Sequence, residues 1–233
     1  MTDRLLHCRN LSLLRGQQSV LEDINLTAHA GDCLAIAGAN GAGKTTLLKC
    51  LMGAFPEATG EILLAGHDPR LTAPKLISRH YAYAPQTPSS AWDYTVEEFS
   101  SLSPHPKKYF HWLERLALKH KAERKLSELS GGERKAAHLC LSLSAGGTPA
   151  GKIFLLDEPA ASLDICRAQI FSEIVQELIQ QGAAVLVATH DLAFIKKCPR
   201  AALLKDGRLI ATGPTAETLT PAVVREIWES GSV

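Results

Sequence analysis

Alternating apolar and polar residues mark the beginning of the chain, the spacing that half-buried β-strands require. Residues 20–28 follow this pattern, and we expect them to form a strand that pairs antiparallel with 5–8 and 11–14. Shorter and almost wholly apolar runs predict three more strands, at 32–37, 60–64 and 81–84. Pro85 ends the last of these, because proline lacks the N–H group that a sheet ladder needs.

The spacing changes to the helical period of about 3.6 residues in the middle of the chain. Thr95 carries a capping hydroxyl at the start of one predicted helix, and two more helices are expected at 107–117 and 131–144. Turn-forming residues at 146–151 close this stretch. The pattern therefore predicts a helical subdomain inserted at 87 to about 148.

Strands and helices alternate through the last third of the chain. The predicted elements are, in order, a strand at 153–156, a helix at 165–180 closed by Gly182, a strand at 183–188, a helix at 191–197 and a hairpin of 201–205 with 208–211. The hairpin turns at Asp206 and Gly207, a pair that favours a two-residue turn. Such alternation is typical of a mostly parallel sheet with helices on both faces.

The elements together predict one domain of the α/β class over residues 1–233. Its core would comprise about 1–86 and 149–233, and would hold the mostly parallel central sheet. The antiparallel strands at the start of the chain would form an N-terminal β subdomain, and residues 87 to about 148 the inserted helical subdomain.

Composition places the chain among ordinary globular proteins. It is 45% apolar and 21% charged, with a formal net charge of +1, so charge indicates neither nucleic acid nor an anionic membrane surface as a partner. No apolar run approaches the ~18 residues that span a bilayer, and the first residues lack the apolar stretch of a signal peptide, so we expect a cytosolic chain. The six cysteines are scattered without a C-x-x-C pair, which favours buried free thiols over disulfides or a metal site.

Residues 38–45 read Gly-Ala-Asn-Gly-Ala-Gly-Lys-Thr, the spacing G-x-x-x-x-G-K-[ST] of a phosphate-binding loop. A predicted strand precedes the loop and a predicted helix follows it, which is the context this motif requires. The glycines allow a tight turn whose N–H groups point inward, and the helix N-terminus adds the positive end of its dipole. Lys44 can reach the terminal phosphates and the Thr45 hydroxyl can ligate Mg²⁺. The loop therefore predicts nucleotide binding.

Two adjacent carboxylates, Asp157 and Glu158, follow the predicted strand at 153–156. Open α/β sheets bind ligands at this edge of their strands. Successive residues of a strand point in different directions, so we expect the two acids to have separate tasks, one in a metal shell and one orienting an attacking water. Two solvated acids at a strand end are the alternative, which the phosphate-binding loop upstream disfavours.

A third segment, Leu129-Ser130-Gly131-Gly132-Glu133, begins a predicted helix and has the composition of a second anion-binding turn. Simple capping of that helix by Ser130 is the alternative. A chain that binds one nucleotide does not need two such turns on one side of it.

Taken in order, these segments resemble those of an ATP-binding cassette (ABC) ATPase of the transporter superfamily. The series also includes Gln86, Ser162-Leu163-Asp164 and Thr189-His190-Asp191, and the resemblance runs from about Leu5 to Trp228. The five-residue signature at 129–133 is close to diagnostic for the family. The resemblance implies a P-loop NTPase fold, ATP and Mg²⁺ as ligands, and ATP hydrolysis as the reaction.

The family pattern implies a role for each matching residue. The residues expected around the ATP phosphates are Gly38, Asn40, Gly41, Ala42, Gly43, Lys44, Thr45 and Thr46. Thr45 and Gln86 would ligate Mg²⁺, with Asp157 holding the metal through water. Glu158 would be the general base or water-orienting carboxylate, His190 would contact the γ-phosphate, and Gln86 would complete the catalytic set.

The resemblance also implies a head-to-tail homodimer. Ser130, Gly131, Gly132 and Glu133 of one copy would reach the ATP bound to the other copy, and Asp164 would couple the two sites. This accounts for the second anion-binding turn. ATP binding would close the dimer and hydrolysis would let it open, which is the power stroke expected for a membrane partner.

One position departs from the family pattern. An aromatic residue usually stacks on adenine just before a glycine near the first strands, and here that place reads Leu14-Arg15-Gly16. Arg15 could stack on adenine through its guanidinium plane, or it could be an exposed loop arginine beside a weak adenine contact. Both interpretations stay open.

The segment from Gln86 to Leu129 would contact membrane partners in such a protein. Trp92 and Tyr94 are candidate contacts in a groove that receives a partner's short helix. Packing inside the helical subdomain is the alternative for Trp92, and it is favoured for Trp112.

Finer similarity points to importers of chelated metals. The stretch at 146–159 resembles the ATPase subunit of the vitamin B12 importer, and the ending at 211–228 resembles ferric-siderophore and vitamin B12 importers. Import of haem, zinc or manganese and export of lipid or peptide are alternatives.

Cassette ATPases that act without a membrane partner are a different class. Those of DNA repair or ribosomes usually carry two cassettes or a long coiled-coil insertion, which this chain lacks, and its charge does not favour nucleic acid. A regulator that binds nucleotide without hydrolysis is disfavoured by Glu158 and His190.

The resemblance therefore implies transmembrane permease subunits and, for an importer, a substrate-binding protein as partners. The chain would lie peripherally on the cytoplasmic face of the inner or plasma membrane. Cargo would be chosen by the membrane subunit and the capture protein, because ATPase subunits of this family do not usually touch it.

Overall fold

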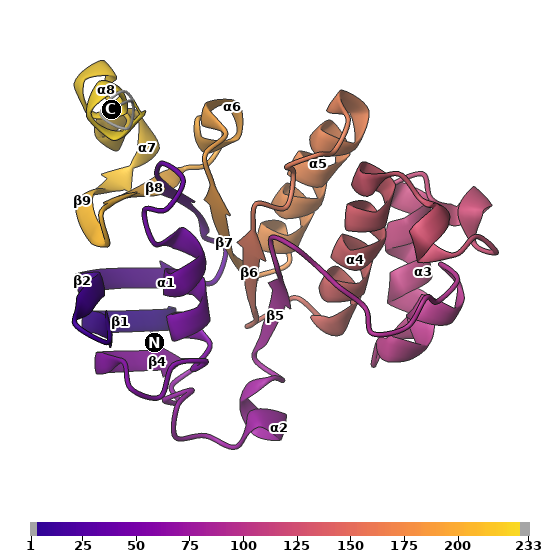
Figure 1. Ribbon diagram of the computed structural model, residues 1–233, viewed down its shortest axis with the longest axis horizontal. Helices are drawn as coiled ribbons and strands as arrows, with labels where there is room; N and C mark the ends of the chain where they lie inside the picture. Colours follow the sequence, from indigo (N-terminus) through magenta and orange to yellow (C-terminus); the bar gives the residue numbers. More distant parts are fainter. Residues whose placement is uncertain (1–3, 229–233) are drawn as a thin grey trace.

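The computed structural model describes residues 4–228 and contains two β-sheets with helices around them (Figure 1). The smaller sheet is antiparallel in the order β2-β1-β4, and consists of β1 (Arg4–Arg15), β2 (Gln18–His29) and β4 (Thr59–Leu64). The two strands expected at 5–8 and 11–14 are one strand, β1. A register shift between Cys8 and Leu11, with a φ of 49° at Asn10, lets the strand continue through the polar residues that separate the two predicted segments.

The larger sheet has six strands in the order β5-β6-β7-β3-β8-β9. These are β3 (Cys33–Ala37), β5 (Tyr81–Ala84), β6 (Ile153–Asp157), β7 (Ala184–Thr189), β8 (Arg200–Lys205) and β9 (Arg208–Pro214). The first five in this order are parallel and β9 runs antiparallel to β8, which confirms the predicted α/β fold with a mostly parallel sheet. Asp206 and Gly207 have φ values of 46° and 76° in the last hairpin, as its two-residue turn requires.

Alternate residues of the central strands belong to two hydrophobic cores. Leu34 and Ile36 of β3 lie in the core shared with α1 and the antiparallel sheet. Ala35 of β3 and Phe154 of β6 lie in the other core, with α4 and α5. Because the central strands are buried on both faces, they are continuous apolar runs rather than alternating ones.

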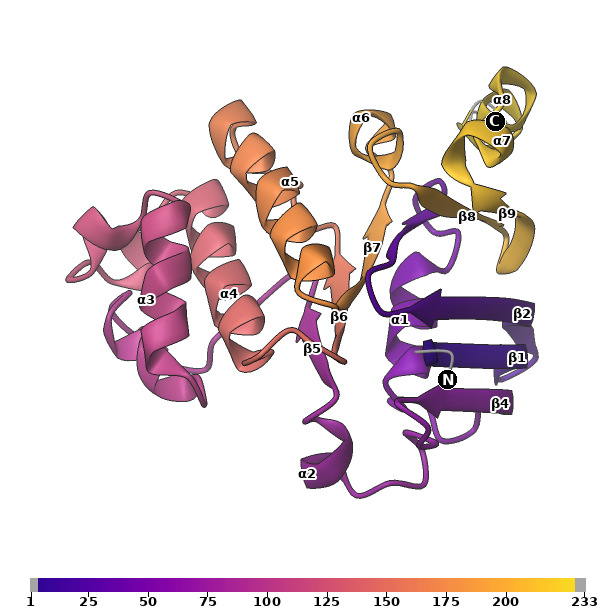
Figure 2. The same ribbon diagram turned by 180° about the vertical axis from the view of Figure 1, so that it is seen from behind.

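The helices are α1 (Lys44–Leu51), α2 (Pro74–Ile77), α3 (Pro106–Arg115), α4 (Gly131–Ala145), α5 (Ile165–Gln180), α6 (Leu192–Ile195), α7 (Thr215–Thr218) and α8 (Pro221–Trp228). Helix α1 covers one face of the central sheet and α5 the other (Figures 1 and 2). Helices α2, α7 and α8 were not expected from the pattern. The first two have four residues each, too few to establish a period. Helix α8 begins with a proline, which is common at the first position of a helix, so the sequence did contain a signal for it.

Helices α3 and α4 stand beside the β5 edge of the sheet (Figure 1). The helix expected to begin at Thr95 is instead a 3₁₀ turn, Glu98–Leu102. The predicted cap is present, because Thr95 N donates to Glu98 Oε2 at 2.9 Å and Glu98 N donates to Thr95 Oγ1 at 3.1 Å. Ser103 is extended, as a residue before proline prefers, and this prevents the turn from continuing as an α-helix.

The burial of individual side chains tests the expectations for the tryptophans and the cysteines. Trp112 is buried in the helical part, as expected, whereas Trp92 is 73% exposed, so the alternative of core packing is wrong for Trp92. All six cysteines are free and five of them are buried, while Cys166 is exposed. Among residues 4–228, no helix combines the length and apolarity that crossing a bilayer demands.

Candidate nucleotide-binding site

Four parallel strands of the central sheet end at one edge and bring four segments together. Strand β3 leads into the loop at 38–45, and β5 ends shortly before Gln86. Strand β6 ends with Asp157, and β7 ends just before His190. The carboxyl edge of such a sheet is where open α/β folds bind ligands, and the predicted chemistry therefore converges there.

A cavity of about 330 Å³ lies at this edge. It is lined by Val20, Asn40, Gly41, Ala42, Gly43, Lys44, Thr45, Thr46, Gln86, Asp157 and Glu158. Gly38 lies outside this lining and has a packing role, because a Cβ atom there would lie 2.3 Å from the backbone oxygen of Leu204. The structure thus brings the predicted loop, the acidic pair and Gln86 to one cavity.

Lys44 is folded back on its own loop. Its Nζ donates to the backbone oxygens of Gly38 at 2.9 Å and Ala39 at 3.0 Å, and lies 3.7 Å from Glu158 Oε1. The residue is only 7% exposed, and burial lowers its pKa while Glu158 and Asp157 oppose that shift. Its ammonium is therefore held at the wall of the cavity, between the loop and Glu158.

Glu158 is held by the last residue of β7 and by the residue after it. Its Oε1 lies 2.8 Å from His190 Nδ1, and its Oε2 accepts a hydrogen bond from Thr189 Oγ1 at 3.2 Å. The backbone of Glu158 has a φ of 47°, a left-handed conformation that costs a non-glycine residue about 1 kcal/mol. Thr189 was part of the segment Thr189-His190-Asp191 in the sequence, but its contact with Glu158 was not predicted.

Asp157 is buried at 0% exposure, and its two carboxylate oxygens accept no well-formed hydrogen bond from the described part of the chain. Burial raises its pKa, the nearby Thr45 hydroxyl lowers it, and the Glu158 carboxylate raises it. A buried carboxylate without partners is costly unless a cation neutralises it.

The oxygen donors around Asp157 fit Mg²⁺. Asp157 offers a carboxylate, Thr45 a hydroxyl and Gln86 an amide oxygen on the wall of the same cavity. Residues 4–228 contain no cluster of three or more His, Cys, Asp or Glu side chains that could enclose a metal ion. A site of this kind suits an ion that keeps several waters and is shared with phosphate oxygens, as Mg²⁺ usually is.

The signature segment caps α4. Glu133 N donates to Ser130 Oγ at 3.3 Å and Ser130 N donates to Glu133 Oε2 at 3.1 Å, so the capping alternative describes a real interaction. Ser130 and Gly131 are nevertheless exposed, and neither lines the nucleotide cavity of its own chain. Gly132 packs tightly, because a Cβ atom there would lie 2.3 Å from the backbone oxygen of Ser162, whereas space is open at Gly131.

Arg167 links two predicted dimer residues, Glu133 and Asp164. Its Nη2 lies 3.9 Å from Glu133 Oε1, and its Nη1 donates to Asp164 Oδ2 at 2.7 Å. Lys121 also pairs with Glu133 at 2.5 Å, and this bond together with the Ser130 N–H lowers the pKa of Glu133 to about 2. Asp164 caps α5 by accepting from Arg167 N at 2.8 Å. Nothing in the local sequence indicated that Arg167 would join these segments.

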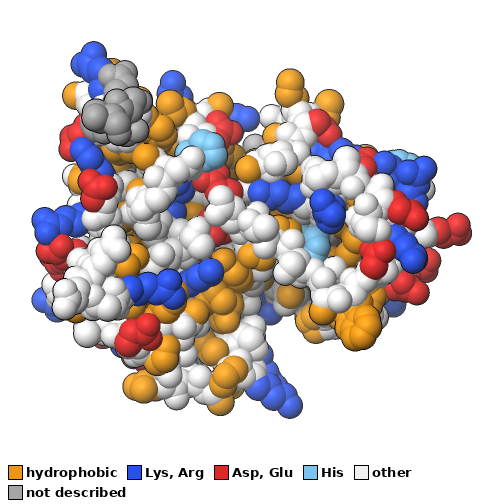
Figure 3. Space-filling view, viewed as in Figure 1, with side chains coloured by type: hydrophobic (Ala, Val, Ile, Leu, Met, Phe, Trp, Pro, Cys, Tyr) orange, Lys and Arg blue, Asp and Glu red, His pale blue; other side chains and the backbone are white. Residues whose placement is uncertain are grey.

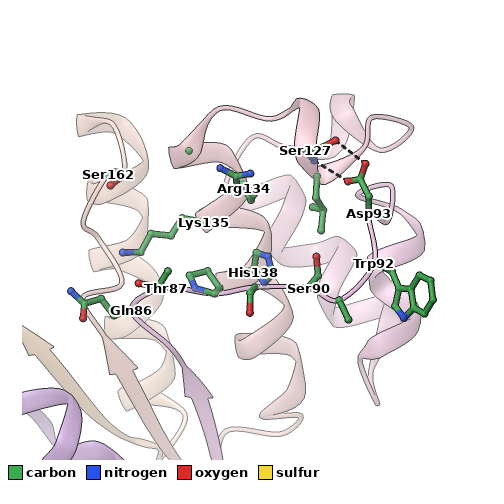
Figure 4. Close-up of a pocket in the computed structure, with 15 residues that line it drawn as sticks. Gln86, Thr87, Ser90, Trp92, Asp93, Ser127, Arg134, Lys135, His138 and Ser162 are labelled. Carbon is green, nitrogen blue, oxygen red and sulfur yellow. Dashed lines mark hydrogen bonds between the residues drawn. The ribbon is translucent and has the colours of Figure 1, made fainter.

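A second cavity of about 660 Å³ lies between the sheet edge and the helical part, and Gln86 lines both cavities. Lys, Arg and His side chains gather around this hollow (Figure 3). Lys135 extends from α4 toward Gln86, and Trp92 lies at the far end (Figure 4). The acid on its wall is Asp93, which accepts two hydrogen bonds from Ser127, from its N at 3.1 Å and its Oγ at 2.8 Å.

Arg15 is exposed at the end of β1, directly before the turn to β2, and lies outside the lining of the nucleotide cavity. Its guanidinium carbon lies 5.0 Å from the centroid of the Phe55 ring, a cation–π arrangement. The structure therefore gives Arg15 an intramolecular partner, and Val20 is the residue of this hairpin that lines the cavity.

Comparison with known proteins agrees with this geometry. The ABC transporter family matches residues 21–161, more than half of the chain. A hemin import ATP-binding protein, HmuV, of Bordetella pertussis is 32% identical, and the alignment covers 96% of this chain and 91% of the relative. A vitamin B12 import ATP-binding protein, BtuD, of Escherichia coli is 34% identical over 94% of this chain and 92% of the relative.

The fold agrees as well. A solved structure of an ATP binding subunit of an ABC transporter is similar with a TM-score of 0.81 at 25% identity, covering 98% of this chain and 95% of that chain. A metal-chelate type ABC transporter in an inward-facing conformation shares the fold with a TM-score of 0.78 at 24% identity, covering 97% of this chain and 89% of that chain. The chain therefore belongs to the ABC transporter family, as one of its ATPase subunits.

Proposed function

We propose that this chain binds and hydrolyses ATP with Mg²⁺ to drive import of a metal chelate through a membrane permease. The convergence of Lys44, Glu158 and His190 at the carboxyl edge of the sheet carries the proposal for ATP hydrolysis. The hemin and vitamin B12 relatives support the cargo class, in which a ferric siderophore also falls. Import of zinc or manganese, or export, is the alternative within the same family.

The loop at 38–45 provides the phosphate site. Its backbone N–H groups and the N-terminus of α1 would bind the β- and γ-phosphate oxygens. Lys44 already points its ammonium into the cavity, where the phosphates would replace the backbone oxygens that it now binds. Asn40, Ala42 and Thr46 line the same cavity and would complete the contacts.

Glu158 is the group that would orient the attacking water and accept its proton. The water oxygen forms a bond to the γ-phosphorus while the bond from that phosphorus to the β–γ bridging oxygen breaks, and the released products are ADP and phosphate. Thr189 and His190 hold the two carboxylate oxygens of Glu158, so its position is fixed before ATP arrives. His190 is half-exposed and would contact the γ-phosphate.

Thr45, Gln86 and Asp157 would hold Mg²⁺, with Asp157 acting through water. When bound, the ion would neutralise charge on the β- and γ-phosphates. The chain's own contribution is a buried carboxylate that accepts no well-formed hydrogen bond from the described residues.

The active form would be a head-to-tail homodimer. Ser130 and Gly131 are exposed and lie outside the nucleotide cavity of their own chain, so they are free to reach the γ-phosphate on the other copy. Glu133 and Asp164, which both pair with Arg167, would maintain the conformation of this surface. ATP between the two copies would then act as the closing force, and hydrolysis would release it.

The second cavity would receive a short helix of the permease. Gln86 lines both this cavity and the nucleotide cavity, which offers a route by which nucleotide state changes the partner's position. Trp92 is exposed at the far end and would pack on the partner, and Tyr94 is partly buried against Phe99. The chain would thus lie on the cytoplasmic face of the membrane, and a substrate-binding protein would deliver cargo on the other face.

Two measurements test the proposal. The purified chain should hydrolyse ATP in the presence of Mg²⁺, and replacing Glu158 by Gln should abolish turnover while leaving ATP binding intact. Vesicles that contain the chain with its permease should accumulate vitamin B12, haem or a ferric siderophore in an ATP-dependent manner. Turnover in the Glu158→Gln variant would reject the assigned base, and transport of none of these chelates would reject the cargo class alone.

A further inference from the structure

Two cysteines that lie 165 positions apart in the sequence meet in the structure. The Sγ atoms of Cys33 and Cys198 are 3.5 Å apart. Cys33 begins β3, and Cys198 follows α6 just before β8. Strands β3 and β8 are parallel neighbours, with Leu34 paired to Arg200. The two thiols therefore lie at the amino ends of these strands, on the sheet edge opposite the nucleotide cavity.

The thiol pair lines a cavity of about 310 Å³ beside α5 and α6. Cys33 and Cys198 are 2% and 4% exposed, so both sulfur atoms are recessed. Phe194 and Val175 form the apolar part of the lining. The exposed residues of the lining are Gln169, Glu173, Gln176 and Lys197, and Lys197 Nζ donates to Gln169 Oε1 at 3.4 Å.

The other cysteines lack this combination of a paired thiol and a cavity. Cys8, Cys50 and Cys140 are buried and lie outside the lining of this cavity. Cys166 is exposed on the first turn of α5. Two thiols in contact at the base of a solvent-connected cavity have the arrangement that thiol–disulfide exchange requires, an attacking thiol and a resolving thiol within reach of each other.

We propose that Cys33 and Cys198 form a thiol–disulfide exchange site that takes a low-molecular-weight disulfide in this cavity and closes to an internal disulfide. The amides of Gln169 and Gln176, the Lys197 ammonium and the Glu173 carboxylate suit a peptide-like disulfide that carries both carboxylate and ammonium groups, such as oxidised glutathione. The site is separate from the ATPase chemistry and does not depend on the function proposed above.

The exchange proceeds in two balanced steps. The Cys198 thiolate attacks one sulfur of the small disulfide, forms a mixed disulfide and releases one small thiolate, which takes the proton that Cys198 lost. The Cys33 thiolate then attacks Cys198 Sγ, forms the internal disulfide and expels the second small thiolate, which takes the proton of Cys33. The two protein thiols are oxidised and the small disulfide is reduced to two thiols.

The hydrogen bonds of the pair assign the order of the steps. Cys33 Sγ donates to Cys198 Sγ, and Cys198 Sγ in turn donates to the backbone oxygen of Phe194 at 3.6 Å. The bond to Cys198 and burial both raise the pKa of Cys33, which disfavours its thiolate. Once Cys198 has entered the mixed disulfide, the hydrogen bond between the thiols is lost, so Cys33 is the resolving residue.

The closed disulfide would close a covalent loop that contains the phosphate-binding loop, Gln86, the acidic pair and His190. Cross-linking so long a loop stabilises a protein chiefly by restricting its unfolded chain. The melting temperature of the oxidised chain should therefore rise by roughly 5 to 15 °C and return to its starting value on reduction.

Oxidised glutathione added to the purified full chain tests the proposal. We expect the intact mass to fall by about 2 Da, one hydrogen atom from each thiol, and peptide mapping to join Cys33 to Cys198. Cys33→Ser should instead accumulate a mixed disulfide on Cys198, heavier by about 305 Da, because no resolving thiol remains. Cys166→Ser serves as the matched control and should cross-link as the parent does.

Two results would overturn the site. One is a folded chain in which Cys166 becomes glutathionylated while Cys33 and Cys198 remain reduced. The other is a Cys33→Ser chain in which Cys198 gains no adduct. Should Cys33→Ser not fold, Cys33→Ala with the same mass measurement replaces it, and the peptide map of the parent decides the pairing on its own. ATP turnover enters none of these readouts.

Discussion

His190 Nδ1 lies 2.8 Å from Glu158 Oε1, so a half-exposed imidazole contacts a carboxylate that is almost wholly buried. Glu158 leaves β6 in a left-handed conformation, and His190 reaches it from the end of β7. The contact joins two neighbouring strands at the edge where the phosphate-binding loop begins. It therefore makes the position of the proposed base dependent on the segment after β7.

His190→Ala should bind ATP with little change but hydrolyse it about 10²- to 10⁴-fold more slowly, because the γ-phosphate contact and the support of Glu158 are both lost. Nucleotide affinity by calorimetry and steady-state phosphate release measure the two effects. His120→Ala, at an exposed position in the helical part, is the matched control. Turnover of the His190 variant equal to that of the parent would show that the contact has no catalytic role.

Glu158→Gln should trap an ATP-bound dimer. The amide keeps the shape of the side chain and can still bind Thr189, but it cannot accept the proton of the attacking water. Size-exclusion chromatography with ATP should show a dimer that disappears without nucleotide. Glu217→Gln, on the exposed surface, controls for loss of one negative charge. A variant that stays monomeric with ATP at high protein concentration would contradict the head-to-tail arrangement.

Lys44→Ala should weaken ATP binding by on the order of 100-fold, the usual effect of losing a charge-assisted contact to phosphate. Fluorescence titration with a labelled nucleotide measures the change, and the exposed Lys75→Ala is the control. Unchanged affinity in the Lys44 variant would mean that the loop at 38–45 does not hold the phosphates.

Arg15→Tyr should tighten ATP binding by about 3- to 10-fold, because an aromatic ring stacks on a base at little cost in conformational freedom. In the parent chain the Arg15 guanidinium is already engaged by the Phe55 ring. Gln17→Tyr, two positions further along in the turn that follows β1, is the matched control. An equal gain in both variants would mean that any aromatic side chain on this turn suffices, and no gain would exclude adenine from this surface.

Stability should depend on His138 in mildly acidic solution. Burial against Phe99 and the nearby Arg134 lower the pKa of His138 from its ordinary 6.5 to about 4. In the unfolded chain His138 therefore takes up a proton near pH 6.5, whereas in the folded chain it does so only near pH 4. The free energy of unfolding consequently decreases as pH falls between these values.

Urea unfolding at pH 7.5 and pH 5 measures this effect. The parent should lose about 2 kcal/mol more between these two pH values than His138→Gln, which cannot titrate there. The exposed His111→Gln should keep the pH dependence of the parent. An identical loss in the parent and in His138→Gln would show that His138 titrates normally in the folded chain.

Local sequence determined the elements and the order in which the chemistry appears. The helix expected at 165–180 is α5, because Asp164 caps its start, Gly182 terminates it and its apolar period is long enough to detect. The phosphate-binding loop is likewise a matter of spacing within eight residues. Short elements such as α2 and α7 were missed because four residues carry no period.

Only the tertiary structure decided which distant residues meet. Thr189 holds Glu158, Arg167 joins Glu133 to Asp164, and Cys33 contacts Cys198 across 165 positions. Each of these contacts is set by the strand order of the central sheet and by the packing of helices on it, which depend on the whole hydrophobic core. Spacing along the chain encodes caps, turns and periods because those interactions span a few residues, whereas contacts between strands and helices depend on packing that no local pattern specifies.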